Sequence, residues 1–295
     1  RSYVDAIETF TFNQLADKVF ESTKINNNEN GNNEFSFLDY NIKFNYKPNA
    51  NNSIFASMIS IDNQLDYVLI DSENNRSFND KLETSNLGYS AGWTINWNKN
   101  ISQHTTAFFS DYKLNYNFIT REDEAQVSDF EKRNTIFDSG LASELNINTS
   151  NHSDLTFGYQ YTLKDVAYAF LNTTNLSFVL DTEDSTIQTH SFYGGYAYNN
   201  PKWFDVSVGL RSTYFKELDA VRLEPRLVVY KSILKNLKFQ ATGEIKNQII
   251  SEIDETILSD LSLENRVWRL ADGNAFPIIN SRHVSGGFMY LKRGL

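Results

Sequence analysis

Apolar and polar residues alternate along most of the chain, in runs longer than ordinary globular strands. Between Leu87 and Trp97, the odd positions are apolar and the even positions are glycine or polar. A period of two places successive side chains on opposite faces of a β-strand. Because globular strands usually extend over about 5 to 6 residues, the pattern predicts unusually long strands, each with one apolar and one polar face.

The alternating runs recur in pairs that are separated by short turns, which is the arrangement of a series of hairpins. The turns are predicted near positions 50, 100, 151, 200 and 235. We expect the apolar face of each run to meet lipid. These apolar faces comprise Tyr40, Ile42, Phe44 and Tyr46; Phe55, Ile59, Ile61 and Leu65; Phe108, Tyr112, Leu114, Tyr116 and Phe118; Phe137, Leu141, Leu145 and Ile147; Leu155, Phe157, Tyr159, Tyr161 and Leu163; Phe204, Val206, Val208 and Leu210; Leu223, Pro225, Leu227 and Val229; and Leu237, Phe239 and Ala241.

Longer polar connections lie between the hairpins, and their lengths alternate with those of the short turns. They span about 69–82, 119–133, 165–187 and 250–282, whereas the connection near 216–222 is brief. Outer-membrane barrels combine short periplasmic turns with long extracellular loops, and a tilted strand crosses the hydrocarbon layer with about 9 to 11 residues. The sequence therefore predicts an all-β protein, a partial antiparallel transmembrane β-barrel of about eleven strands.

Two segments depart from this alternation. Asn13 to Glu21 and Ile253 to Trp268 place apolar residues at helical spacing. Each is predicted to form a short helix on the extracellular side.

Composition and charge narrow the function. The chain has no Cys, which excludes disulfides, thiol redox chemistry and thiolate metal sites. A net charge of -10 with scattered Lys and Arg argues against a nucleic-acid partner. The mean hydropathy of -0.46 is compatible with a membrane barrel, because only every second residue of its strands faces lipid.

We find no catalytic constellation. The four His at 104, 152, 190 and 283 have no metal-ligand spacing, and the acidic runs at 122–124 and 181–184 lack the spaced ligands of a calcium loop. The sequence thus predicts a protein that is not an enzyme, with no cofactor and no metal site.

Charged residues gather on the polar face of three adjacent predicted strands near the end of the chain. At membrane depth, ionisable side chains must face water or opposite charges. This set is therefore expected to form a solvated lumen wall or a docking site for a plug domain. Its members are Arg211, Arg222, Glu224, Arg226, Glu244 and Lys246.

The longest connection, from Ser251 to Arg282, is expected to form part of the extracellular mouth and to contribute to ligand contact or gating. Aromatic and Arg side chains dominate recognition surfaces. The candidate ligand contacts are Arg266, Trp268, Arg269 and Asn274. Packing of Trp268 within the loop itself is an equal alternative.

Three stretches resemble the barrel of TonB-dependent receptors, especially those of Bacteroidota. They are RSYVDAIETFTFNQLADKVF at the start of the chain, RLEPRLVVY followed by LKFQATGEIKNQII over 222–250, and LSLENRVWRLADGNAFPIINSRHVSGGFMY over 261–290. Such receptors import scarce nutrients across the outer membrane of Gram-negative bacteria. The resemblance implies a 22-stranded barrel, so residues 1–295 are expected to be a barrel fragment without the plug domain and the carboxy-terminal strands.

The resemblance also implies the partners. They are outer-membrane lipid, the receptor's own plug, the TonB energy-coupling complex, a surface lipoprotein, and a ligand such as a siderophore–iron complex, cobalamin or a glycan. A passive porin is the membrane alternative. A secreted β-repeat carbohydrate-binding protein is the alternative of another class, although its blades would use four short strands per repeat.

Overall fold

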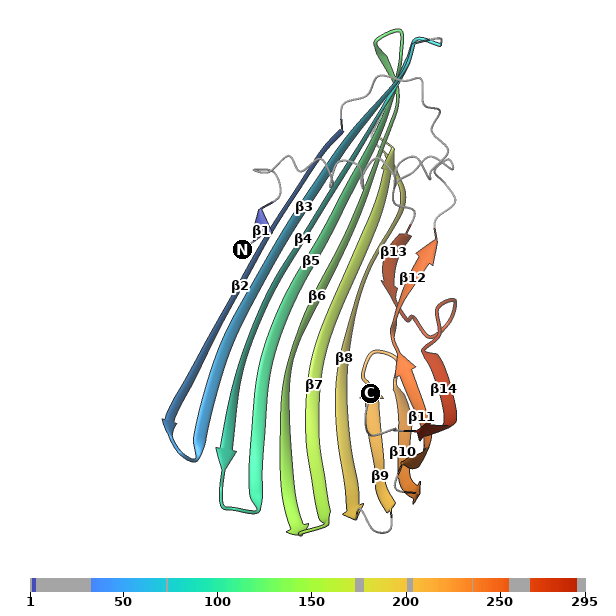
Figure 1. The fold of residues 1–295 in the computed structure, drawn as a ribbon. Helices are drawn as coiled ribbons and strands as arrows, with labels where there is room; N and C mark the ends of the chain where they lie inside the picture. The colour runs from blue at the N-terminus through green and yellow to red at the C-terminus, as the bar shows by residue number, and fades with distance from the viewer. Residues whose placement is uncertain are drawn as a thin grey trace.

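The computed structural model describes residues 2–3, 33–72, 74–172, 178–200, 204–234, 236–254 and 266–290, in which every regular element is a β-strand (Figure 1). Twelve strands form one antiparallel sheet in the order β1 to β11 and then β14, while β12 and β13 pair separately. The strands are β1 Ser2–Tyr3, β2 Asn33–Asn49, β3 Asn52–Asp71, β4 Arg76–Asn96, β5 Ile101–Glu122, β6 Ala125–Ser150, β7 Ser153–Asn172, β8 Phe178–Asn200, β9 Phe204–Phe215, β10 Ala220–Leu234, β11 Leu237–Gln248, β12 Ile250–Asp254, β13 Arg266–Leu270 and β14 Ile279–Tyr290.

The main sheet is a meander in which sequence neighbours pair antiparallel, except that β12 and β13 leave it before β14 pairs with β11. Of these twelve strands, β1 has only two residues and the other eleven are long, which confirms the predicted number of strands. The sheet curls around the β12–β13 hairpin (Figure 1). This architecture confirms an all-β partial barrel. Within the described ranges, no helix is long and apolar enough to cross a membrane.

The predicted short turns near 50, 100 and 151 are confirmed, because strands end and resume across 50–51, 97–100 and 151–152. The turns predicted near 200 and 235 include residues 201–203 and 235, which lie outside the described residues. The brief connection near 216–222 is also confirmed, as a turn at 216–219.

Three of the predicted long loops, at 69–82, 119–133 and 165–187, are wrong where the structure describes them, because the strands continue through them. At 165–187, β7 and β8 pair up to Asn172 and Phe178. At 119–133, β5 and β6 pair up to Glu122 and Ala125. The two residues between them, Asp123 and Glu124, have φ of 48° and 67°, as a tight two-residue hairpin turn requires. At 69–82, β3 and β4 likewise pair up to Asp71 and Arg76. Paired strands satisfy each other's backbone hydrogen bonds, so they can extend beyond a membrane as a ribbon.

The predicted helix over Ile253 to Trp268 is also wrong where the structure describes it. Ile253 pairs with Val267, and Glu252 pairs with Trp268, in the β12–β13 hairpin. β-Branched residues at these positions favour a strand, and the pairing decides between two readings of a short apolar run. Residues 255–265 and the predicted helix over Asn13 to Glu21 lie outside the described residues.

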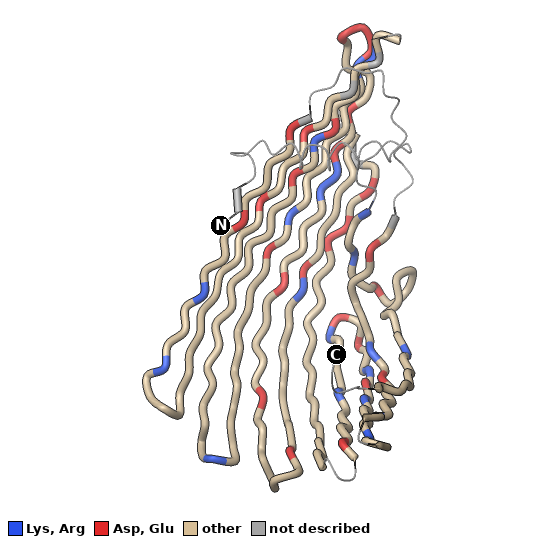
Figure 2. The backbone as a smooth tube through the Cα atoms, viewed as in Figure 1, with Lys and Arg blue, Asp and Glu red and all other residues tan. Residues whose placement is uncertain are grey.

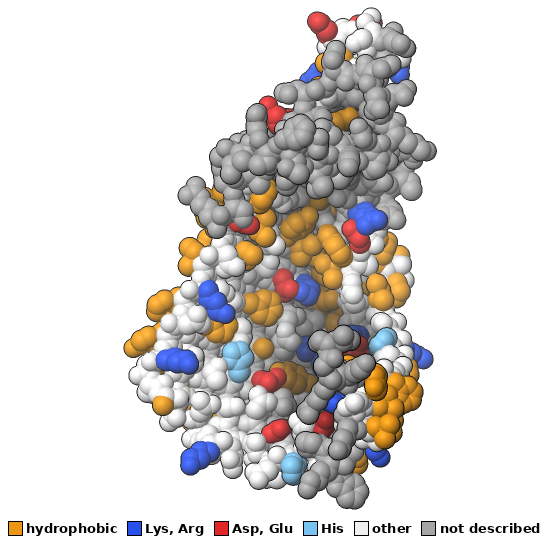
Figure 3. Space-filling view, viewed as in Figure 1, with side chains coloured by type: hydrophobic (Ala, Val, Ile, Leu, Met, Phe, Trp, Pro, Cys, Tyr) orange, Lys and Arg blue, Asp and Glu red, His pale blue; other side chains and the backbone are white. Residues whose placement is uncertain are grey.

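The sheet has two chemically distinct faces. The concave face is the one against which β12–β13 packs; it carries the even positions of β4 to β7 and the odd positions of β8 and β9. Figure 3 shows this side, with hydrophobic side chains gathered around its upper middle part. The opposite face is the convex face.

The apolar residues change from the convex to the concave face along single strands. On β7, Phe157 near the short turn is on the convex face and 50% exposed, whereas Phe170 at the other end is on the concave face and 4% exposed. The convex apolar run of β7, from 155 to 163, has about the 9 to 11 residues of a membrane crossing. Beyond it, the convex positions include Asp165, and the concave positions carry Val166 and Tyr168.

This change corrects two of the expected lipid-facing runs. The ring of Phe55 on β3 lies over Gly92 and stacks on His104, on the concave face. On β5, Tyr116 is buried and faces Lys132 across the sheet. The residues that share these concave faces, contrary to expectation, are Phe55, Ile59, Ile61, Leu65, Phe108, Tyr112, Leu114, Tyr116 and Phe118. Alternation fixes which residues share a face, but it does not say which face meets lipid.

Candidate functional site: the charged concave wall

The charged residues predicted to share a wall lie together on the concave face of β9, β10 and β11. Arg211 is directly opposite Glu224, and Arg226 is directly opposite Glu244. Figure 2 shows basic and acidic positions interspersed on these strands. Arg222 and Lys246 are on the same face, at the next alternate positions of β10 and β11. All six residues therefore share one face of the sheet, as their parity predicts, and their place on a lumen or plug surface stays a prediction.

Arg211 is the best-anchored cation of this wall. Its Nη2 donates hydrogen bonds of 2.8 Å to Gln160 Oε1 on β7 and to Ser191 Oγ on β8. Its Nε lies 3.7 Å from Glu224 Oε2. Its guanidinium also lies 5.7 Å from the centre of the Tyr193 ring, which allows a cation–π interaction. Contacts from three neighbouring strands thus fix its position.

Tyr193 connects Arg211 to a carboxylate that lies two strands away. Its ring covers Gly158 on β7 so closely that any Cβ at this position would overlap it. The ring can therefore lean across β7, and its hydroxyl donates to Glu144 Oε2 on β6 at 3.2 Å. Glu144 Oε1 accepts a second hydrogen bond, of 2.9 Å, from Asn146 Nδ2.

These residues belong to one continuous cross-strand row. Each member is the direct pairing partner of the next, from β4 to β10. In strand order, the row is Thr94, His104, Glu144, Gly158, Tyr193, Arg211 and Glu224. A row of this kind can hold a chain of hydrogen bonds across the inner wall, because directly opposite Cβ atoms are about 4.5 to 5.5 Å apart.

Glu224 is more sheltered than Glu244, with side chains 17% and 25% exposed. Its Oε1 accepts hydrogen bonds from the backbone N–H of Asn247 at 2.8 Å and from its Nδ2 at 3.1 Å. The pairing of β10 with β11 begins at Arg226 and Glu244. The Glu224 side chain therefore takes the place of a backbone acceptor where the ladder stops.

Arg226 and Lys246 share a single carboxylate. Glu244 Oε1 lies 2.8 Å from Lys246 Nζ, and Glu244 Oε2 lies 3.7 Å from Arg226 Nε. The Arg226 and Lys246 side chains are 63% and 59% exposed. Together with Glu144, Tyr193, Arg211 and Glu224, they line a hollow of about 440 Å³ on the wall.

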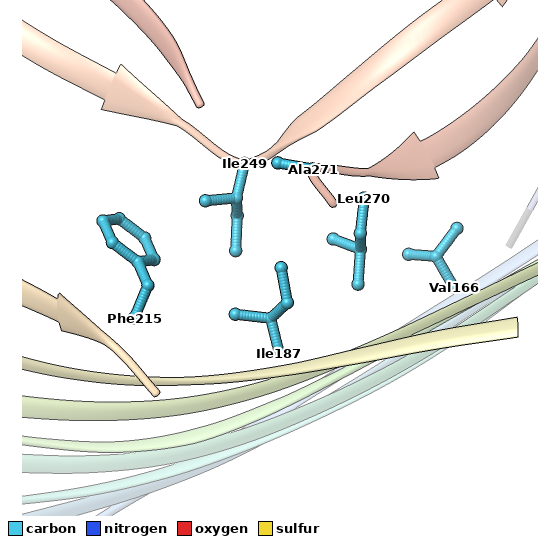
Figure 4. Close-up of a cluster of buried hydrophobic side chains, with 6 residues drawn as sticks. All are labelled: Val166, Ile187, Phe215, Ile249, Leu270 and Ala271. Atoms are coloured by element: carbon cyan, nitrogen blue, oxygen red, sulfur yellow. The ribbon is translucent and has the colours of Figure 1, made fainter. Parts of the chain in front are cut away.

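The connection that contains the candidate ligand contacts folds inward rather than standing open at a mouth. Its β13 strand contacts β6, β7 and β8. Figure 4 shows Val166, Ile187 and Phe215 pointing from the sheet toward Ile249, Leu270 and Ala271 of this connection. Burial of this cluster holds the hairpin on the concave face.

Polar contacts add to the docking of the hairpin. Asn134 on β6 is 1% exposed, and its Oδ1 accepts from the backbone N–H of Trp268 at 2.8 Å. Its Nδ2 donates to the carbonyl oxygen of Trp268 at 3.1 Å and to that of Ala167 at 2.9 Å. Arg269 forms an ion pair with Glu183 on β8 and lies 3.8 Å from the centre of the Phe276 ring.

The four candidate ligand contacts thus have different surroundings. Trp268 packs beside the buried cluster, in line with the packing alternative, and Arg269 is tied to the wall. Arg266 pairs with Glu252 at 3.5 Å within the hairpin and remains exposed. Asn274 is exposed in the turn that follows β13. Arg266 and Asn274 are therefore the two of the four that lie exposed.

Two carboxylates near the hairpin and the upper wall have shifted pKa values. Burial raises the pKa of Asp80 to about 6, and the hydrogen bond from the Tyr116 hydroxyl opposes this shift in part. The backbone N–H groups of Phe276 and Asn274 donate to the Asp272 carboxylate and lower its pKa. These two hydrogen bonds also hold the turn after β13. In the part of the chain that the structure describes, no group of His, Asp and Glu could hold a metal ion.

Sequence reasoning missed Glu144, Tyr193, Gly158 and Asn134. The partners of each come from other strands, so their roles depend on register. Glycines that alternate with polar residues at 88, 92 and 158 were the available signal, because a strand glycine often marks a place where another group approaches closely.

Comparison with known proteins gives structural likeness only. No protein-family model matches the sequence, and a search among curated proteins finds no match. The solved structure of the RagAB peptide transporter matches with a TM-score of 0.52 and 9% identity over 86% of this chain and 38% of that one. FyuA, the ferric yersiniabactin uptake receptor from Yersinia pestis, matches with a TM-score of 0.46 and 7% identity over 75% of this chain and 44% of that one.

The chain thus spans less than half the length of these two structures. At such low identity, the likeness to the RagAB transporter concerns the fold alone. Together with the curled antiparallel sheet, it shows that the chain has the fold of a partial outer-membrane β-barrel.

Proposed function

We propose that the chain forms part of the barrel wall of a TonB-dependent receptor that actively imports a scarce nutrient across the outer membrane of a Gram-negative bacterium. The observation that carries this proposal is that the same half of the sheet is apolar on its convex face and charged on its concave face. In the half of the sheet near the short turns, Leu141, Phe157 and Leu210 are exposed on the convex face, while the concave face carries Arg211 and Glu224. Lipid outside and water inside account for both.

The hairpin supports a gated receptor over an open porin. β12 and β13 are packed onto the concave wall by a buried cluster and by Asn134. An element held inside a barrel narrows its lumen, as a receptor that releases its ligand only on demand requires. A passive porin with a constricting segment is the second candidate. The continuous twelve-stranded sheet argues against a secreted protein with four-stranded repeat blades.

We propose the substrate class from the notable likenesses in fold and from the resemblance in sequence. Two of the similar structures are named as a peptide transporter and a ferric yersiniabactin uptake receptor. Siderophore–iron complexes, cobalamin, glycans and peptides are accordingly the candidates. Arg266 and Asn274 are the proposed contacts on the hairpin side.

The proposal includes a plug domain, the TonB energy-coupling complex and a surface lipoprotein as partners. Glu224, Arg226 and Glu244 would pair with the plug. Removal of one member of a buried ion pair can cost about 3 to 5 kcal/mol, whereas a water-exposed pair contributes about 0 to 1 kcal/mol. If these residues hold a plug, Glu224→Ala in the complete protein raises passive leakage of small solutes. Unchanged leakage removes the docking role and leaves the barrel fold untouched.

Deletion of the gene tests the function. Uptake of a radiolabelled ferric siderophore, cobalamin, an oligosaccharide and a peptide is compared between the parent strain, the deletion strain and a complemented strain, with and without an uncoupler. Active import predicts that one substrate loses uptake in the deletion strain and that the uncoupler abolishes its uptake in the parent. Uptake that persists with the uncoupler favours the porin, and unchanged uptake of all four contradicts both transport readings.

A further inference from the structure

The cations of the concave wall differ in how many contacts they make with other side chains. Arg211 is tied to Gln160, Ser191 and Glu224. Arg226, one alternate position further along β10 from Glu224, has a single ion-pair contact, through Nε at 3.7 Å to Glu244. Among the described residues, its two terminal nitrogens make no hydrogen bond. Its planar fork of donors therefore opens into the hollow.

Lys246 adds a second available cation beside Arg226. Both are directed to Glu244, whose side chain is 25% exposed, far less than either of its cationic partners. Glu224, the other carboxylate of this part of the wall, is engaged by Asn247 and Arg211. The carboxylates thus lie close to the sheet, and the positive groups extend furthest from it.

Charge is unevenly placed along the hollow. At the β9–β11 end, the hollow is lined by Arg211, Arg226, Lys246 and Glu224, and Glu244 lies beside it in contact with Arg226 and Lys246, which leaves a local excess of one positive charge. The third carboxylate, Glu144, lies on β6 at the other end, and both of its oxygens accept hydrogen bonds, from Tyr193 and Asn146. An incoming oxyanion would therefore meet cations first.

A guanidinium fork suits one ligand chemistry in particular. Its paired N–H donors match the two oxygens of a carboxylate or phosphate, and such bidentate pairs are stronger than neutral hydrogen bonds. A neighbouring ammonium supplies a mobile point charge without competing for the same geometry.

We propose that the hollow beside Arg226 and Lys246 is a binding site for a carboxylate- or phosphate-bearing solute. Arg226 contacts the oxyanion bidentately, Lys246 neutralises it, and Glu244 sets the affinity by competing for both cations. As a transport subsite, this inference rests on the proposed function. As a binding site, it is measured independently of uptake.

Calorimetric titration of the complete protein in a non-ionic detergent, with citrate and separately with inorganic phosphate, tests the site. We expect Arg226→Gln to weaken binding at least about tenfold. Glu244→Gln is expected to tighten it several-fold, because the two cations lose their internal competitor. Opposite effects of two neighbouring substitutions cannot arise from misfolding.

Arg222→Gln is the matched control. Arg222 lies on the same face of β10, but outside the hollow, and its Nη1 donates to the carbonyl oxygen of Val221 at 3.3 Å. The inference predicts unchanged binding in this variant. Equal losses in Arg222→Gln and Arg226→Gln would show diffuse attraction and overturn the site.

The remaining outcomes are also decisive. If the wild-type protein binds neither anion and Arg226→Gln instead makes an amino-terminal domain protease-sensitive, the cations serve only the plug contact of the proposed function and the solute site is wrong. If anion binding follows the predicted pattern while gene deletion leaves uptake unchanged, the site stands and the proposed function fails. Preference for citrate or for phosphate identifies which oxyanion the site recognises.

Discussion

The side chain of Asn134 binds both backbone polar groups of Trp268, as a neighbouring β-strand would. The carboxamide accepts from the Trp268 N–H and donates to the Trp268 carbonyl, while it also donates to Ala167 on its own wall. A single buried amide thereby replaces the pair of backbone hydrogen bonds that would join two neighbouring strands, and it links two separate sheets. The hairpin is consequently held at a defined register on the wall.

Asn134→Ala is expected to loosen β13. The substitution leaves the buried N–H and carbonyl of Trp268 unsatisfied, and a buried unsatisfied group costs about 1 to 3 kcal/mol. Hydrogen exchange of the amides of Val267 to Leu270 should accelerate accordingly, while that of the centre of β5 and β6 stays slow. Asn115→Ala, at an exposed convex position of β5, is the control and should change neither. Unchanged exchange in β13 would show that the apolar cluster alone holds the hairpin.

Gly158→Ala is expected to break the contact between Tyr193 and Glu144. A methyl group at 158 occupies the place of the Tyr193 ring, so the ring must swing away from β7 and lose the Glu144 and Arg211 contacts. We expect a loss of about 1 to 3 kcal/mol in urea unfolding in detergent. Gly243→Ala is the control, because a Cβ there has nothing within 4 Å. Tyr193→Ala removes the same contacts that Gly158→Ala disturbs, so in a Tyr193→Ala background Gly158→Ala should cost little further stability. If the stability losses of Gly158→Ala and Tyr193→Ala add fully in the double variant, the mechanism is contradicted.

Asp80 predicts a pH dependence of the upper wall. Its pKa of about 6 lies above the ordinary 3.8, so the folded state binds the proton more tightly than the unfolded state. Stability is therefore highest below about pH 4 and falls as the pH rises to about 6, by roughly 3 kcal/mol at most. Hydrogen exchange of β4 and β5 near Asp80 and Tyr116, corrected for intrinsic rates, measures it. Asp80→Asn should remove the dependence and protect these amides at pH 7; a dependence that persists in this variant must come from another group.

Local alternation was sufficient to predict the strands, the short turns and the shared wall of Arg211, Glu224 and Arg226. Each of these follows from the period of two, which is a property of the backbone. The orientation of β5 was not predictable in the same way. Leu114 and Tyr116 belong to a buried cluster on the concave face, whereas Phe157 is exposed on the convex face. One pattern has two physical causes.

The inward fold of the connection after β11 also lay beyond local reasoning. Its helical spacing at Ile253 and Ile257 competed with strand pairing, which tertiary contacts decided. Asn134 and Glu183, which hold β13, are 134 and 86 positions away from Trp268 and Arg269 in sequence. Nothing in the surroundings of either residue along the chain indicates its partner.

Lipid access along β7 tests the central claim, that the apolar surface is convex near the short turns and concave beyond them. Single cysteines replace Phe157, Gln160 and Phe170 in the complete protein, are labelled with a bimane fluorophore, and are exposed to lipid carrying a doxyl quencher in the acyl chain. We expect strong quenching at 157 and little at 160 or 170, although the cysteine at 170 replaces an aromatic residue as the one at 157 does. Equal quenching at 157 and 170, or stronger quenching at 160 than at 157, would contradict it.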